Sequence, residues 1–517
     1  MTQTLVREVE RKYELPEGIG FPDLDDLPGV ETDAAADVLK LEAVYFDTAD
    51  FRLASHRVTL RRRTGGDDAG WHLKLPAGTD SRDEIRWPLG RASRTVPAEL
   101  AGLVAGYARG LPLAPVARIQ TTRTRRRLRD RAGAVLAEVV ADEVAGQTLG
   151  STTTLSSWSE MEVELAGGRV DLLDKVEARL RSAGVRRSPN ASKLARVLGD
   201  KVLGDKALGD KALGDKLASG KARAGGRTIG GLVVGQLRGQ VQKVLAYDPR
   251  VRRDEPDAVH KMRVATRRLR SALQTFGAVI DRQETRPLTD ELRWLAGVLG
   301  EARDLEVLRA RLDDRVVTTP AELVVGPVQA RITGHLAHQH AQAREHLLAA
   351  LSGDRYYALL DALEGLVADP PLTVRARRPA RKTLPRTLLT NQRRVGRRLE
   401  SALALPAGPD RDVAVHETRK AAKRARYAGE LAQPALGKGA KKFAADLADV
   451  QEVLGVHQDS VVSRGVLREL GMQAYLAGEN GFTFGLLHRA ELAAADDVER
   501  QLPAIHRRVR KAGGRLR

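Results

Sequence analysis

Charged and apolar residues alternate along the first strand-like stretch of the chain, residues 8–15. Glu8, Glu10, Lys12 and Glu14 occupy every second position, and mostly apolar residues fill the positions between them. Alternate side chains of a β-strand point to opposite faces of its sheet. The pattern therefore predicts a strand with one charged face and one mostly apolar face.

Later stretches repeat this alternation. They are residues 58–63, 71–75, 82–89, 121–128, 134–145 and 158–165, and residues 41–48 predict a further short strand. Any single charged face could be a solvated strand face. Because the alternation recurs from strand to strand, we expect the strands to close into a barrel with a charged interior. Helices or a partner would then cover the apolar outer surface.

The predicted interior contains clustered carboxylates. Glu8 and Glu10 lie on one strand, and Glu160, Glu162 and Glu164 lie on another. Like charges this close repel one another strongly unless a cation lies between them. Oxygen ligands of this kind suit Mg²⁺ or Mn²⁺ better than Zn²⁺. The lysines and arginines of the same interior could hold a polyanion.

From about residue 230 onward, the apolar positions follow a helical period, and two motifs occur twice. Residues 260–270 and 416–426 share the pattern His-x-x-Arg-x-x-x-(Arg/Lys)-Arg-x-Arg. A Gly-x-x-x-Asp motif occurs at residues 300–304 and again at 455–459. The duplication predicts two helical bundles related by a pseudo-twofold axis.

Each copy places a row of cations on one helix face, because positions i, i+3, i+7 and i+10 lie on the same side of a helix. The rows are His260, Arg263, Arg267 and Arg270 in the first copy, and His416, Arg419, Lys423 and Arg426 in the second. Such a row is costly unless an anion lies along it. The simpler explanations are a solvated basic face and histidines that serve only the helix start. Two further basic runs, residues 375–386 and 393–398, could extend an anion site or be solvated.

The charge of the chain is unevenly distributed. Residues 1–200 contain 30 basic and 30 acidic residues, so the whole net charge of +19 falls on residues 201–517. This asymmetry favours a polyanionic partner for the second part: inorganic polyphosphate, nucleic acid or an anionic membrane. Only 4% of all residues are aromatic, which leaves few platforms for stacked bases and makes nucleic acid the less favoured partner.

The chain of 517 residues is too long for a single core. It contains no cysteine, which excludes disulfides and thiolate metal sites. No signal-peptide pattern is present and no apolar run approaches the ~20 residues of a membrane span, so we expect a cytoplasmic protein with no membrane segment. A Leu-Gly-Asp-Lys repeat predicts a linker at residues 201–226 between domains at 1–200 and 227–517. The second domain would have halves at about 227–385 and 386–517.

The first part resembles the CYTH domain, the family of triphosphate tunnel metalloenzymes. The resemblance covers roughly residues 4–200. It begins with Glu8-x-Glu10-x-Lys12, which is similar to the ExExK signature of the family, and it continues through the charged strands, including Arg82-x-Glu84. It implies an eight-stranded antiparallel β-tunnel that acts on triphosphate compounds with a divalent metal. Together with the helical second part, the expected fold is multidomain α+β.

The resemblance also implies three sets of functional residues. The metal ligands would be Glu8, Glu10, Glu160, Glu162 and Glu164. The triphosphate-binding cations would be Arg61, Arg63, Lys74, Arg86, Arg123, Arg125 and Lys193. The catalytic candidates would be Lys12, Glu138 and Asp142. Lys12 would hold phosphate oxygens, and Glu138 or Asp142 would position water.

The second part resembles the CHAD domain, the conserved-histidine α-helical domain, over about residues 228–510. This resemblance implies a pair of helical bundles that binds inorganic polyphosphate through a basic surface and associates with polyphosphate granules. The two rows of cations would line that polyphosphate site.

Together these features predict a Mg²⁺- or Mn²⁺-dependent triphosphatase that hydrolyses inorganic triphosphate or a related short polyphosphate. The helical domain would bind inorganic polyphosphate. The alternative is a non-catalytic polyphosphate-binding or granule-associated protein. The acidic set of the tunnel matches the family pattern throughout, which favours the enzyme.

Overall fold

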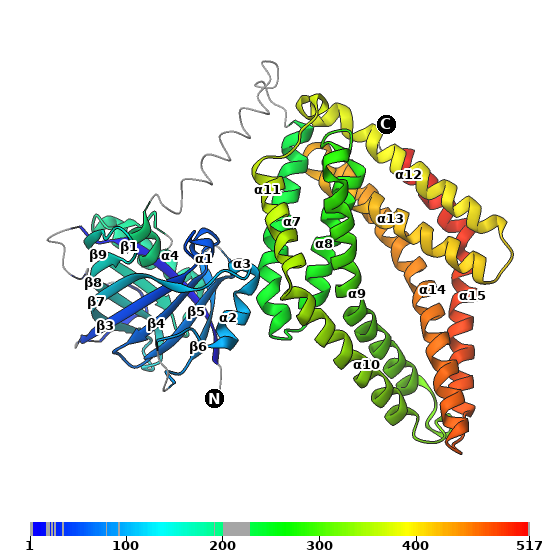
Figure 1. Ribbon diagram of the computed structural model, residues 1–517, viewed down its shortest axis with the longest axis horizontal. Coiled ribbons are helices and arrows are strands. Elements are labelled where there is room, and N and C mark those ends of the chain that lie inside the picture. Colours follow the sequence, from blue (N-terminus) through cyan, green and yellow to red (C-terminus); the bar gives the residue numbers. More distant parts are fainter. Residues whose placement is uncertain are drawn as a thin grey trace. The chain divides into compact units, whose positions relative to one another are not determined.

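The computed structural model describes the chain in two compact units, Met1–Leu208 and Gly209–Arg517 (Figure 1). The described residues are 4–16, 21, 24, 27–33, 36–78, 80–90, 94–190, 192–199 and 228–514. The linker predicted at residues 201–226 lies outside them.

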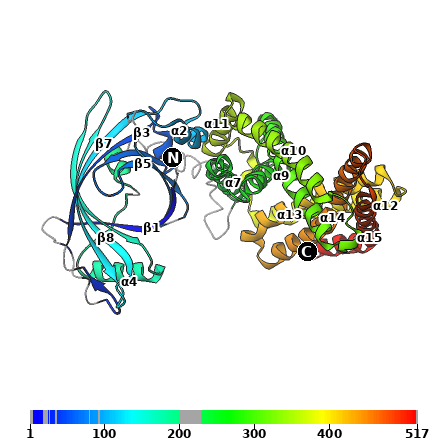
Figure 2. The same ribbon diagram turned by 90° about the horizontal axis from the view of Figure 1, so that it is seen from below.

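The first unit is a closed barrel of eight long antiparallel strands. They are β1 (Thr4–Glu14), β3 (Asp37–Asp47), β4 (Thr59–Thr64), β5 (Gly70–Pro76), β6 (Ser81–Trp87), β7 (Ala114–Arg129), β8 (Val135–Thr148) and β9 (Leu155–Leu165). Their order around the barrel is β1-β6-β5-β4-β3-β7-β8-β9, and β9 pairs with β1 to close it. Two-residue strands β2 (Glu31–Thr32) and β10 (Arg186–Arg187) pair with β7 and β1. The predicted eight-stranded β-tunnel is confirmed, and Figure 2 shows its strands curving around a common axis.

The pairing of β1 with β9 brings the two carboxylate-rich strands side by side. Glu10 lies opposite Glu164, and Lys12 lies opposite Glu162. The apolar positions of these strands point outward, where helix α4 (Val170–Ser182) covers them. The packed set includes Tyr13, Met161, Val163, Leu173 and Val176. The outward face of each strand is therefore mostly apolar and covered, with Arg11 of β1 paired to Glu177 of α4, which leaves the alternate, charged face for the interior.

A short helix closes part of the barrel interior. Helix α5 (Lys193–Leu198) begins at Ser192, whose side chain accepts a hydrogen bond from the Ala195 backbone N–H at 3.1 Å. Its Leu194 and Val197 pack against inward-facing residues that include Tyr45. This packing sends the Lys193 side chain into the charged interior.

The second unit is all-helical. Its α-helices are α7 (Ile229–Arg252), α8 (Ala258–Thr275), α9 (Arg282–Thr318), α10 (Val328–Leu351), α11 (Asp354–Ala368), α12 (Ala380–Ala404), α13 (Pro409–Leu436), α14 (Lys438–Leu476) and α15 (Phe482–Gly514). Short 3₁₀ turns occupy Ala321–Leu323 and Val374–Arg377. The order α7–α10 recurs as α12–α15, and the long helices α9 and α14 occupy equivalent places (Figure 1). The predicted pair of related helical bundles is confirmed.

Helices α8 and α13 carry the duplicated cation motif and pack against each other between the two halves. On α8, Val259, Met262 and Leu269 are buried, whereas the cations of the motif lie on a different face. On α13, Val415, Ala422 and Ala425 are buried in the same way. Apolar packing of one face thus fixes the direction of the cationic face.

Candidate functional site

The barrel encloses a cavity of about 330 Å³ whose lining is mostly charged. Its lining includes Glu8, Glu10, Lys12, Arg61, Arg63, Lys74, Arg82, Glu84, Arg86, Arg123, Arg125, Glu138, Glu162, Glu164 and Lys193. Two of the predicted residues, Asp142 and Glu160, are buried behind this lining and contact Lys193. The structure therefore brings the predicted tunnel residues together around one interior.

Three predicted metal ligands, Glu8, Glu10 and Glu164, form an acidic group on the paired strands β1 and β9. Lys74 donates to Glu8 at 2.5 Å, and Lys12 donates to Glu10 at 3.0 Å. Although burial opposes it, the charges of Lys12 and Lys74 lower the pKa of Glu10 to about 2. Burial and the neighbouring Glu8 carboxylate raise the pKa of Glu164 to about 7.

The other predicted metal ligands, Glu160 and Glu162, belong to a second acidic group with Asp142. The Lys193 ammonium lies 2.7 Å from Glu160 and 2.8 Å from both Glu162 and Asp142. These carboxylates lie close enough together to hold a cation. In this structure the lysine supplies that positive charge.

The predicted phosphate-binding cations extend along the cavity wall. Arg123 donates to Asp142 through two nitrogens, at 2.8 and 2.6 Å. Arg125 is held by exposed acids, Asp37 and Asp67, each 3.0 Å away. Burial and the nearby Arg61 charge lower the pKa of Arg63 to about 9. Cations that are buried and close together favour an anion in the space that they line.

The helical unit contains a cavity of about 870 Å³, which is lined from both halves. Its lining includes His260, Arg263, Arg267 and Arg270 from α8 and His416, Arg419 and Lys423 from α13. Burial, together with Arg419 and Arg267, lowers the pKa of Lys423 to about 7. A solvated basic face would not crowd its charges in this way, so the cavity is suited to a polyanion.

The Gly-x-x-x-Asp motifs hold one arginine of each row. Arg263 donates to Asp304 at 2.7 Å, and Arg419 lies 3.8 Å from Asp459. A Cβ atom at Gly300 would lie 3.0 Å from the Arg263 guanidinium, and one at Gly455 would lie 3.1 Å from that of Arg419. Each glycine therefore lets a guanidinium lie flat against the neighbouring helix, within reach of the aspartate one turn later.

Comparison with known proteins identifies the domains of the chain. A CYTH domain model matches residues 6–198, and a CHAD domain model matches residues 235–468. Uncharacterized proteins of two Mycobacterium tuberculosis strains, CDC 1551 / Oshkosh and ATCC 25618 / H37Rv, are each 38% identical over 521 residues. Those matches cover 98% of this chain and 96% of each relative. The chain belongs to the CYTH–CHAD family.

Two solved structures are similar to part of this CYTH–CHAD protein. PptA from Streptomyces chartreusis is 21% identical, covers 54% of this chain and 99% of its own, and has a TM-score of 0.44. The CHAD domain from the plant Ricinus communis is 24% identical, covers 57% of this chain and 96% of its own, and has a TM-score of 0.42.

Family membership makes the CYTH barrel a triphosphate tunnel of a kind that uses divalent metals. The acidic group Glu8, Glu10 and Glu164 offers carboxylate oxygens only, the ligand type that such ions take, and the tunnel carboxylates whose oxygens lie within 4.8 Å of one another are Asp142, Glu160 and Glu162. Within the described part of the chain, Glu164 forms no ion pair with a lysine or arginine, and burial together with the neighbouring Glu8 and Glu10 carboxylates raises its pKa. Among the described residues, no helix is long and apolar enough to cross a membrane.

The CYTH tunnel also contains residues to which the sequence pattern assigns no role. Glu84 is 1% exposed, accepts a hydrogen bond from Arg86 and lies 2.9 Å from Nδ1 of the buried His72. Tyr45 accepts from Arg61 at 3.4 Å. The alternation of residues 82–86 already placed Glu84 on the inward face, but only the pairing of β5 with β6 shows that His72 holds it.

In the CHAD cavity, one predicted residue lies elsewhere. Arg426 is absent from the described lining, and it instead pairs with Glu430 at 3.2 Å and stacks over Tyr427. Arg424 lines the cavity in its place, and burial with nearby arginines lowers its pKa to about 10. From the basic run at residues 393–398, Arg394 and Arg398 also line the cavity.

Proposed function

We propose that the CYTH tunnel is a metal-dependent phosphohydrolase that cleaves inorganic triphosphate or a related short polyphosphate. One observation carries this proposal: the acidic group Glu8, Glu10 and Glu164 shares a single cavity with a wall of lysines and arginines. An acidic group suits a divalent cation, and a cationic wall suits phosphate oxygens. Hydrolysis of a phosphoanhydride needs both.

The tunnel residues would act mainly by position and charge. Glu8, Glu10 and Glu164 would hold Mg²⁺ or Mn²⁺, which neutralises charge that develops on the transferring phosphoryl group. Lys12 and the wall cations Arg61, Arg63, Lys74, Arg86, Arg123, Arg125 and Lys193 would bind the phosphate oxygens. Their fixed charges supply electrostatic stabilisation without reorganisation.

Between the two candidates for positioning water, Glu138 is the better placed. It lines the cavity, and its side chain is 35% exposed with one arginine contact, to Arg127 at 3.4 Å. Asp142 is fully buried, and Lys193 and Arg123 occupy its oxygens. Those charges also lower the pKa of Asp142 against the effect of burial, which makes it a weak proton acceptor.

The CHAD cavity would bind inorganic polyphosphate along the two cation rows. Seven of the eight predicted row residues line it, and the acidic residues of its described lining are Asp304, Glu417 and Asp459. Polyphosphate presents regularly spaced anionic oxygens and no bases, which matches a lining of guanidinium and ammonium groups with one aromatic residue, Tyr427.

The tunnel proposal is tested by phosphate release from the purified full chain with Mg²⁺ or Mn²⁺. The panel is inorganic triphosphate, thiamine triphosphate, ATP and long polyphosphate, and Glu8→Ala/Glu10→Ala is the control. We expect metal-dependent release from triphosphate that the double variant loses. Release from no substrate, with polyphosphate still bound, would favour a non-catalytic polyphosphate-binding protein.

The CHAD proposal is tested by binding of fluorescent long polyphosphate at several salt concentrations, with single-stranded DNA as competitor. We expect Arg263→Gln/Arg419→Gln to weaken polyphosphate binding. Arg309→Gln removes an arginine that is paired with Asp313 on the same unit and is absent from the cavity lining, and should leave binding unchanged. Equal loss in both variants would point to a nonspecific charge effect.

A further inference from the structure

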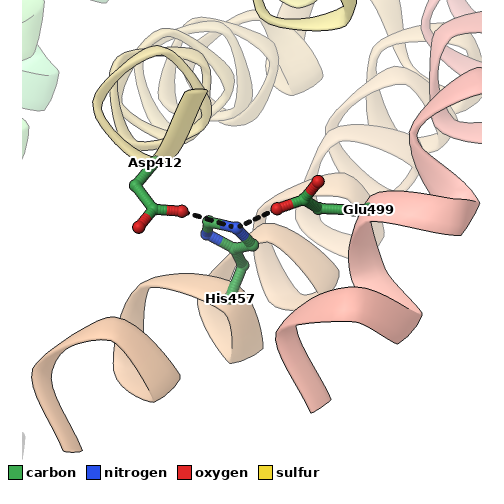
Figure 3. Close-up of side chains that lie close together, drawn as sticks. All are labelled: Asp412, His457 and Glu499. Carbon is green, nitrogen blue, oxygen red and sulfur yellow. Dashed lines mark hydrogen bonds and ion pairs between the residues drawn. The ribbon is translucent and has the colours of Figure 1, made fainter. Parts of the chain in front are cut away.

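In the helical unit, a histidine and two carboxylates form a cluster outside the lining of the basic cavity. Asp412 of α13, His457 of α14 and Glu499 of α15 converge on one point (Figure 3). The Nε2 atom of His457 lies 3.3 Å from Asp412 Oδ1 and 3.5 Å from Glu499 Oε1. The imidazole is 1% exposed, and the two carboxylates are 21% and 16% exposed.

We propose that Asp412, His457 and Glu499 form a divalent metal site that ties three helices together, with Zn²⁺ as the best-suited ion. Two carboxylate oxygens and an imidazole nitrogen are a ligand set that borderline transition metals accept. The carboxylates are partly exposed, which gives an ion access and leaves a fourth position for water.

The distances favour a metal over a hydrogen-bonded imidazolium. One Nε2–H can point directly at only one acceptor, yet two carboxylate oxygens face this nitrogen (Figure 3). Both contacts also exceed the ~2.7–2.9 Å of a charge-assisted N–H···O⁻ bond. Ligand atoms around a four-coordinate metal with bonds of about 2.0–2.2 Å lie about 3.3–3.6 Å apart, and Nε2 of His457 lies at such a distance from both carboxylate oxygens.

The outer oxygen of each carboxylate is held by an arginine. Arg411 donates to Glu499 Oε2 at 2.7 Å, and Arg464 donates to Asp412 Oδ2 at 3.4 Å. The oxygens that face His457 are therefore Asp412 Oδ1 and Glu499 Oε1, and both remain available to an ion. Outer partners that orient ligands in this way are common around protein metal sites.

The internal duplication shows that the fold does not require this histidine. Gly455 corresponds to Gly300, so His457 corresponds to Ala302, which is also buried. The second half therefore carries an imidazole where the first half packs a methyl group. This difference argues for a role specific to the second half, and it supplies a matched substitution, His457→Ala.

The test uses the full chain with Glu8→Gln/Glu10→Gln, so that two of the three proposed tunnel ligands are removed. Equilibrium dialysis with Zn²⁺ and visible absorption of added Co²⁺ should both report one bound ion per chain. His457→Ala should abolish that binding, and Arg464→Gln should weaken it by about tenfold. His506→Ala is the control, because His506 has one described carboxylate partner, Glu400 at 3.0 Å, and it should leave binding intact.

Thermal unfolding gives the second readout. Zn²⁺ should raise the unfolding temperature of the Glu8→Gln/Glu10→Gln chain and should not raise that of its His457→Ala derivative. If His457→Ala does not fold, Asp412→Asn takes its place. No bound ion in the parent chain, or equal binding after loss of His457, would overturn the proposal and leave an ion-pair network of arginines and carboxylates.

Discussion

At the scale of single residues, the tunnel balances buried charge within the protein itself. Lys193 is the clearest case, because its ammonium lies within 2.8 Å of three carboxylates while its side chain is 9% exposed. Removing one partner from a buried charged group is strongly destabilising, because the remaining charges lose their compensation. The same residues that would bind substrate therefore also hold the barrel together.

Lys193→Met should lower the free energy of unfolding by about 3–5 kcal/mol, because Asp142, Glu160 and Glu162 would lose their shared cation. Arg196 is three residues later on the same helix, pairs with Glu14 at 3.6 Å and stacks over Trp158 at 4.9 Å. Arg196→Gln should cost about 0.5–2 kcal/mol. Urea denaturation measures both, and equal costs would contradict this account of Lys193.

Glu164→Gln tests the metal ligands. In the metal-free chain, the substitution removes a carboxylate beside Glu8 and should leave the unfolding temperature in EDTA unchanged or higher. With Mn²⁺, it should lower triphosphate turnover by at least ~10-fold, the effect that even outer-shell changes have on metal sites. Lower stability in EDTA would show that Glu164 has a structural partner instead.

If the helical cavity binds polyphosphate as proposed, Lys423 should make that binding depend on pH. Its pKa in the free protein is lowered to about 7, so above pH 7 it loses its proton, whereas a bound polyanion favours the protonated form. Binding then takes up a proton, and affinity should fall by up to ~10-fold per pH unit between pH 7 and 9. Lys423→Arg should flatten that slope in a titration with long polyphosphate. An unchanged slope would rule out Lys423 as its source.

At the scale of secondary-structure elements, alternation predicted the inward face of each strand. The register of the paired strands shows side-chain contacts that the alternation does not predict. The partners of Glu84 become visible only when β5 pairs with β6, and the place of Lys193 depends on α5 packing into the barrel. These contacts join residues far apart in the sequence, so no local pattern contains them.

The helical period alone predicts that both rows of cations lie on one face and line the same site, and one of their residues lies elsewhere. Arg270 lines the cavity, but the equivalent Arg426 is held by Tyr427 and Glu430. Local partners therefore override the helical face. The presence of glycine in the duplicated motif, in contrast, is explained by the close approach of the Arg263 and Arg419 guanidinium groups.

Gly455→Ala tests this explanation of the motif glycine. Alanine raises helix propensity by about 1 kcal/mol relative to glycine. Its Cβ would lie 3.1 Å from the Arg419 guanidinium and should displace it, which weakens polyphosphate binding. Gly465 lies on the same helix with open space at its Cβ, so Gly465→Ala should stabilise the chain and leave binding unchanged. Calorimetry and polyphosphate titration separate the two effects.

At the scale of the whole molecule, the chain joins two charged interiors of different kinds. The CYTH tunnel pairs acids with bases in one closed space, whereas the CHAD cavity is lined mainly by cations. The net charge of the chain, which lies entirely after residue 200, follows the same division. The functions proposed for the tunnel and for the cavity should therefore respond to different substitutions.

The most direct measurement is metal-dependent phosphate release from inorganic triphosphate by three full-length chains in one assay. They are the unmodified protein, Glu8→Gln/Glu10→Gln and Arg263→Gln/Arg419→Gln. We expect release by the first, loss in the second and retention in the third. No metal-dependent release by the unmodified chain, or equal release by the Glu8→Gln/Glu10→Gln chain, would contradict it.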